Sequence, residues 1–134
     1  MAFLNRETGE LTFADGLQLS SGLAIGEVAQ RLNGALDGRV CLSSHSVAGG
    51  RLVPVCTVEG GSLQSIVLCV SSVGGKAGVP ARRQRAFLFA RLGLRDPFPD
   101  TLEPVRVRCP FGELIVAADP HTGRTEARVM YAAR

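Results

Sequence analysis

The sequence predicts an α+β protein, built as a meandering antiparallel sheet of six to eight strands with two helices packed on one face. Segments of alternating apolar and polar residues recur along the chain, and turns rich in Asn, Asp, Pro and Gly separate them. Only two segments have helical spacing, which is too few for a doubly wound parallel sheet. With 134 residues the chain fits one domain, residues 1–134.

Two hairpins with similar turns are predicted near the ends of the chain. Their strands are residues 2–4 and 11–13 in the first hairpin, and 107–118 and 125–131 in the second. Asn5 and Asp119 begin the turns, and a glycine follows four residues later in each case. Because such a glycine closes the turn with a positive φ, we expect positive φ at Gly9 and Gly123.

The first helix is expected from about Gly22 to Asn33. Ser20 and Ser21 offer an N-cap, and Asn33-Gly34 is a suitable end. The apolar residues between them recur at helical spacing, at Ile25, Val28, Ala29 and Leu32.

The second helix is expected between Pro80 and Gly93. Proline suits the first helical position because its missing N–H is not needed there, and glycine suits the position after the last turn. The apolar residues of this segment form a broad face, so its arginines are expected on the opposite, solvated face.

Three central strands are expected at residues 39–44, 52–58 and 63–72, since glycine turns separate these segments and the third is rich in β-branched residues. The run from Ile66 to Val70 is apolar on both faces, so this strand should be central and covered. Such cover requires helices above the sheet or a partner below it.

The composition favours a globular, cytoplasmic protein. Apolar residues make up 46% and charged residues 20% of the chain, and no run of 18 apolar residues could cross a membrane. The first residues lack the basic region and long apolar stretch of a secretory signal. We therefore expect no membrane association.

The four cysteines are expected to be reduced and mostly buried. Cys41, Cys56, Cys69 and Cys109 form no CxxC pair, and each lies in an apolar, strand-like segment. Disulfides, or a metal bound through Cys41 and His45, are weaker alternatives. We expect no metal and no cofactor.

The net charge is +3, yet six basic residues and no acidic one lie between Lys76 and Arg95. This basic segment could be a solvated helix face, a site for an acidic protein, or a surface that follows a phosphate backbone. Gly74-Gly75-Lys76 has the ingredients of a phosphate loop but not its spacing. The Pro-rich loop that follows the helix adds a second recognition element. The candidate binding residues are Lys76, Arg82, Arg83, Arg85, Asp96, Phe98 and Asp100.

Catalytic residues are not evident. Ser44-His45-Ser46 places hydroxyl groups beside an imidazole, but neighbouring strand residues point to opposite faces, so adjacency does not make a dyad. His121 lies at a turn tip. The sequence therefore predicts a protein that is not an enzyme.

The final segment, from Cys109-Pro110-Phe111-Gly112 through Asp119-Pro120-His121-Thr122-Gly123 to Val129-Met130-Tyr131, resembles the endings of small bacterial immunity-type and uncharacterised proteins. Immunity proteins neutralise a toxin by binding it. The resemblance implies a function of this class and no particular site residues. Because the chain is basic, it implies a toxin other than a nuclease.

Together these observations favour a non-enzymatic protein-binding module, with an immunity-type inhibitor as its most specific form. It would use a sheet face or the loops at one end of the sheet. The alternative is nucleotide or nucleic-acid binding through the basic segment 76–95, whereas the expected partner is a protein. A homodimer through the sheet edges is also compatible with the sequence.

Overall fold

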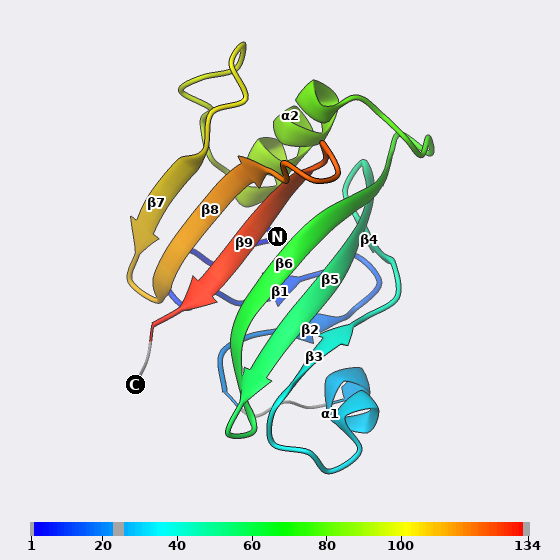
Figure 1. Ribbon diagram of the computed structural model, residues 1–134, viewed down its shortest axis with the longest axis vertical. Coiled ribbons are helices and arrows are strands. Elements are labelled where there is room, and N and C mark those ends of the chain that lie inside the picture. The colour runs from blue at the N-terminus through cyan, green and yellow to red at the C-terminus, as the bar shows by residue number, and fades with distance from the viewer. Residues whose placement is uncertain (1, 23–25, 133–134) are drawn as a thin grey trace.

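The computed structural model describes residues 2–22 and 26–132, in which there are two helices and nine strands (Figure 1). The elements are β1 (Leu11–Thr12), β2 (Gln18–Leu19), α1 (Gly26–Leu32), β3 (Gly38–Cys41), β4 (His45–Val47), β5 (Gly50–Glu59), β6 (Ser62–Val73), α2 (Ala81–Leu92), β7 (Val105–Cys109), β8 (Gly112–Ala118) and β9 (Thr125–Tyr131). None of these helices is long and apolar enough to cross a membrane.

A seven-stranded antiparallel sheet dominates the fold. Its strand order is β3-β5-β6-β9-β8-β7, and β4 also pairs with β5. Strands β1 and β2 form a separate two-stranded sheet. The predicted α+β class is therefore confirmed, and β6 lies near the centre of the large sheet, as its apolar sequence indicated.

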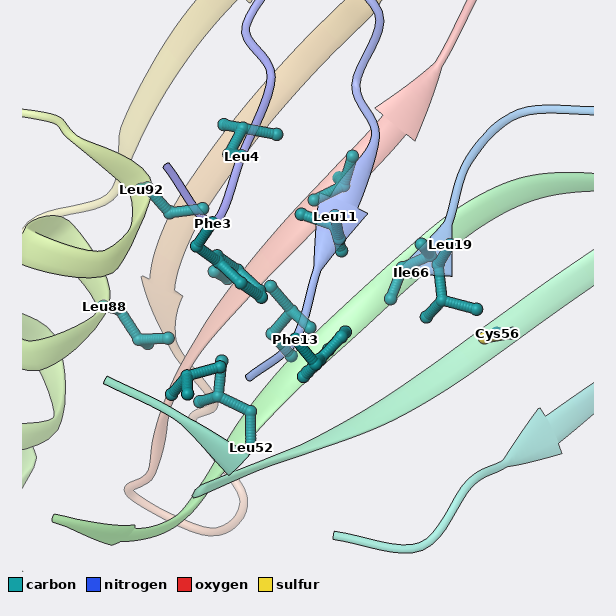
Figure 2. Packing of buried hydrophobic residues seen from close by; sticks show 14 of the residues in the cluster. Phe3, Leu4, Leu11, Phe13, Leu19, Leu52, Cys56, Ile66, Leu88 and Leu92 are labelled. Atoms are coloured by element: carbon teal, nitrogen blue, oxygen red, sulfur yellow. The ribbon is translucent and has the colours of Figure 1, made fainter. Parts of the chain in front are cut away.

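One face of the large sheet carries the core. Leu52, Ile66 and Leu114 point into it from three strands and are fully or almost fully buried. Helix α2, the N-terminal segment and β1–β2 cover this face, as Figure 2 shows for Phe3, Phe13, Leu88 and their neighbours. The rings of Phe3 and Phe13 meet edge to face at 5.0 Å. Val28 of α1 belongs to the same cluster, so both helices contribute to one core.

The two predicted turns have the expected chemistry. The φ angles are 76° at Gly9 and 71° at Gly123, and the prediction of positive φ at both glycines is confirmed. The side-chain oxygen of Asn5 accepts hydrogen bonds from the backbone of Glu7 and Thr8, and that of Asp119 accepts one from His121. Polar side chains that bond to the backbone two or three residues ahead are what stabilise such turns.

Several predicted boundaries are wrong. The segment 107–118 is not one strand, because the chain turns at Pro110 and Phe111 and returns as β8. Proline removes a ladder donor, and Gly112 adopts φ 151°, where a Cβ atom would lie 2.0 Å from the carbonyl oxygen of Met130. Residues 2–4 form only a bridge from Leu4 to Leu11 rather than a strand.

Helix α1 is shorter than predicted within the described residues, beginning at Gly26 and ending at Leu32. The predicted start near Gly22 and the apolar position Ile25 adjoin or fall within residues 23–25, which lie outside the described residues. The predicted end is confirmed, since Asn33 and Gly34 both have positive φ. Helix α2 ends as predicted at Gly93, with φ 70°.

Candidate functional site

The candidate residues Arg85 and Asp96 belong to the core structure and not to a solvated surface. The guanidinium of Arg85 donates to both carboxylate oxygens of Asp96, at 2.6 and 2.8 Å, and to the backbone oxygen of Glu103 at 2.5 Å. It also lies 5.2 Å from the ring centre of Phe89. The side chain is only 1% exposed, so the prediction that Arg85 lies on the solvated face of the helix is wrong.

This ion pair fixes the segment after α2. Hydrogen bonds from Arg85 lower the pKa of the Asp96 carboxyl, and a further bond from the backbone of Phe98 acts in the same direction. The N–H donors of a buried guanidinium need acceptors, and Asp96 with the Glu103 carbonyl accepts three hydrogen bonds from Arg85. The pair thus holds the 96–103 segment against the helix.

The other candidate residues, Arg83 among them, remain exposed, but Lys76 lies apart from the residues of the 96–100 loop. Arg82 donates to the backbone oxygen of Asp100 at 2.9 Å, which joins the first turn of α2 to the loop. Phe98 in that loop is 43% exposed. Lys76 lies in the link between β6 and α2, which extends away from the loop on the opposite side of the helix (Figure 1). The structure therefore does not bring Lys76 together with Phe98.

The outer face of the large sheet, here called the open face, is not covered by any helix or strand of the described residues (Figure 1). Side chains alternate along a strand, so residues between core positions point to this face. In β5 and β6 these residues are apolar: Val55 pairs with Val67, and Val53 with Cys69. All four are half-buried, and the prediction that β6 is covered holds for its inner face alone.

The other half of the open face is charged. It carries four arginines and two glutamates, namely Arg39, Arg106, Arg108, Arg128, Glu113 and Glu126. Arg106 and Glu113 form an ion pair at 2.8 Å. The other three arginines have no ion pair with any residue of the described ranges. Positive charge therefore exceeds negative charge on this face.

Arg128 is at the junction of the two halves. It lies opposite Val67 on one neighbouring strand and Ile115 on the other, so its cross-strand neighbours are apolar. Met130, two residues further along β9, is 41% exposed on the same face. Arg and Met are both enriched where proteins bind one another.

A hollow of about 480 Å³ opens on this face beneath the β8–β9 turn. Its walls include Arg106, Ile115, Pro120 and Arg128. A concave, partly apolar patch between arginines could receive a side chain from another protein, which is how interface anchors are usually seated.

His45 is the centre of a second polar cluster that the sequence did not reveal. Its Nδ1 lies 3.0 Å from a carboxylate oxygen of Asp15, and its Nε2 lies 3.5 Å from the hydroxyl of Ser43. A carboxylate oxygen of Glu27 also lies 3.7 Å from Nε2. Asp15 is 30 residues away in sequence, and no local pattern could have predicted this contact.

The His45 cluster has the geometry of a structural bridge. Burial raises the pKa of Asp15, but hydrogen bonds from the backbone of Ser46 and Leu17 and from His45 outweigh burial and lower it. A nucleophile needs a histidine nitrogen that is free to accept its proton. Here a second carboxylate faces that nitrogen, so the cluster ties β4 to α1 and to the 13–17 turn.

The cysteines differ in exposure. Cys56 is buried, Cys69 and Cys109 are half-buried, and Cys41 is exposed on the open face. The prediction that the thiols are mostly buried is therefore wrong for Cys41, which lies on the edge strand β3. In the part of the chain that the structure describes, no three His, Cys, Asp or Glu side chains are grouped so that they could hold a metal.

Comparison with protein-family models, with characterised proteins and with solved structures found no match to this chain.

Proposed function

We propose that the protein is a non-enzymatic protein-binding module whose partner docks on the open face. The observation that carries this proposal is the composition of the outward positions in β5 and β6. Antiparallel sheets with one solvated face normally carry polar residues there. In this chain Val53, Val55 and Val67 occupy these positions, and Val67 lies beside Arg128, which has no ion pair with a described residue.

The charges on the open face favour an acidic partner. Arg39, Arg108 and Arg128 have no ion pair in the described residues, whereas Arg85 in the core is fully compensated by Asp96. Complementary potentials raise the rate of association and exclude wrong partners. A protein with acidic residues around an apolar patch matches both halves of the face.

The 96–100 loop is the competing surface. Phe98 is as exposed as Met130, at 43% against 41%. The loop, however, is held by Arg85 and Arg82 through its own Asp96 and Asp100, so its polar groups are largely used within the chain. On the open face three of the four arginines, Arg39, Arg108 and Arg128, form no ion pair with a described residue.

The most specific form of this proposal is an immunity-type inhibitor of a toxin. It rests on the resemblance of the final hairpin and on a residue inventory without evident catalytic groups. If the gene adjoins one for a secreted toxin, co-expression of this chain should restore growth of cells that make that toxin. Loss of rescue in Arg128→Glu, with rescue kept in Arg83→Glu, would support inhibition through the open face.

Site-specific photocrosslinking tests the docking surface itself. A photoreactive phenylalanine analogue replaces Met130 on the open face or, as the matched control, Phe98 on the loop, and the native host expresses each variant. We expect a discrete protein adduct from position 130 only. An adduct from position 98 alone would place the partner on the loop, and no adduct at either position would contradict the proposal.

A further inference from the structure

A second pocket lies on the helix side of the sheet, away from the open face. Its volume is about 430 Å³, and four segments of the chain form its walls, one of which is β1 with Thr12. The N-terminal segment contributes Phe3 and Arg6, the β4–β5 turn contributes Ala48, and the last turn of α2 contributes Arg91 and Leu92. Pockets of about 300–1,000 Å³ with mainly apolar walls and a few polar groups are typical of small-molecule sites.

The polar side chains that line this pocket are either positively charged or neutral. Two arginines line it, and no acidic residue is among the described residues of its wall. Neither Arg6 nor Arg91 forms an ion pair with a described residue. The pocket is thus a local concentration of positive charge beside apolar side chains.

Arg91 is incompletely satisfied. Its Nη1 donates to the backbone oxygen of Ala48 at 2.5 Å, and its guanidinium carbon lies 5.6 Å from the ring centre of Phe87. Its Nε is buried and has no hydrogen-bond partner among the described residues. Arg85, six residues earlier in the same helix, donates two hydrogen bonds to a carboxylate and one to a carbonyl. The charge of Arg91 has no such compensation.

The C-terminal end of α2 lies at this pocket, and its partial negative charge weakly disfavours a bound anion. A helix carries about half a negative charge at its C-terminus. The backbone N–H groups of Gly93 and Leu94 already bond to the carbonyls of Ala90 and Phe89, which satisfies part of that end. Two full positive charges outweigh half a negative one, so the pocket as a whole attracts anions.

We propose that this pocket binds a small organic oxyanion. Its carboxylate or phosphate group would lie between Arg6 and Arg91, where guanidinium groups can form charge-assisted hydrogen bonds. Its apolar body would contact Phe3, Leu4 and Leu92, which line the same pocket. This site is separate from the docking surface, and neither proposal depends on the other.

Titration followed by amide chemical shifts tests this proposal. The probe is hexanoate, with hexanol as the neutral control of the same length and inorganic phosphate as a competitor. We expect saturable shifts at Leu4, Ala48 and Gly93 with hexanoate, no saturable shift with hexanol, and displacement by phosphate. Arg6→Gln, an exposed position, should weaken hexanoate binding about tenfold or more, since it removes a charged donor.

Arg83→Gln is the matched control, because Arg83 is exposed on α2 and does not line the pocket. It should leave hexanoate binding unchanged. Absence of saturable shifts up to about 20 mM hexanoate, where a weak site would already be filled, would overturn the proposal. Equal binding of hexanol, or equal weakening by Arg83→Gln, would overturn it as well.

Discussion

Replacing Asp96 with Asn should destabilise the protein strongly, because the change leaves Arg85 buried without its carboxylate. Removing one partner of a fully buried ion pair costs about 3–5 kcal/mol. Asp96 keeps 14% of its side-chain surface exposed, so water screens part of this loss. We therefore expect the free energy of unfolding to fall by about 2–3 kcal/mol, somewhat less than for a fully buried pair.

Urea denaturation and calorimetry measure this loss. For a chain of this size a loss of 2–3 kcal/mol corresponds to a fall in Tm of roughly 8–10 °C. The control is Asp100→Asn in the same loop, where Arg82 bonds the backbone oxygen and not the carboxylate. Asp100→Asn should change Tm by less than about 2 °C. Equal small shifts in both variants would refute the structural role of the pair.

The same pair predicts a pH dependence. The pKa of the Asp96 carboxyl in the folded protein lies below the ordinary value of 3.8, so this carboxyl binds a proton more readily in the unfolded state. The stabilisation is therefore complete above about pH 5 and is lost as the pH falls through the folded-state pKa. The Asp96→Asn variant should lose stability less steeply below pH 4, as urea midpoints across pH would record.

Three further predictions concern the turns, the thiols and the basic segment. Gly123→Val should cost about 1–2 kcal/mol through its positive φ alone, and Gly9→Val about 3 kcal/mol, as overpacking against an aromatic ring adds to that strain. At Gly9 a Cβ would lie 2.6 Å from Tyr131, whereas Gly123 has open space; equal melting temperatures of the two variants would contradict this. One thiol, Cys41, should react fast with an alkylating reagent in native buffer, while Cys56 stays protected because burial raises its pKa to about 12. Mass spectrometry of the labelled peptides decides this, and fast labelling of Cys56 would argue against the core. No appreciable DNA or RNA binding is expected at about 0.15 M salt, where non-specific binders reach roughly 10⁻⁴ to 10⁻⁶ M. Tight binding that Arg82→Glu with Arg83→Glu abolishes, in a protein that circular dichroism shows folded, would favour the nucleic-acid alternative.

Local chemistry made the hairpin turns predictable. Asn5 and Asp119 bond to the backbone within three residues, so the information needed lies within a few positions. The inner strand faces were predictable for a similar reason, because Leu52, Cys56 and Ile66 follow a regular alternation. Such features depend on spacing alone.

The position of Arg85 could not be predicted from spacing. The 94–104 segment packs on α2 and buries Arg85 through Asp96 and the Glu103 carbonyl. Gln84 is buried on the side of the helix that meets β9. Gln84 accepts a hydrogen bond from the backbone of Thr125, 41 residues away. Hydrogen bonds to partners distant in sequence offset the cost of burying these polar side chains, and only the tertiary fold brings those partners near.

The candidate site was predictable in part. The apolar run from Ile66 to Val70 signalled a strand with two apolar faces, and Val67 and Cys69 do point to the open face. No pattern in the sequence indicated that the arginines of that face share one surface. Arg39 and Arg128 are 89 positions apart in the sequence, and only the strand order places them on one surface.

The most direct test of docking on the open face is the affinity of the crosslinked partner, purified and titrated against three forms of this chain. Truncating or reversing a hot-spot arginine at the centre of an interface costs at least about 2 kcal/mol, which is about a thirtyfold loss of affinity. We predict such a loss for Arg128→Glu and an unchanged Kd for the charge-matched Arg83→Glu, with both variants folded. An unchanged Kd for Arg128→Glu, or an equal loss in both, would contradict the account.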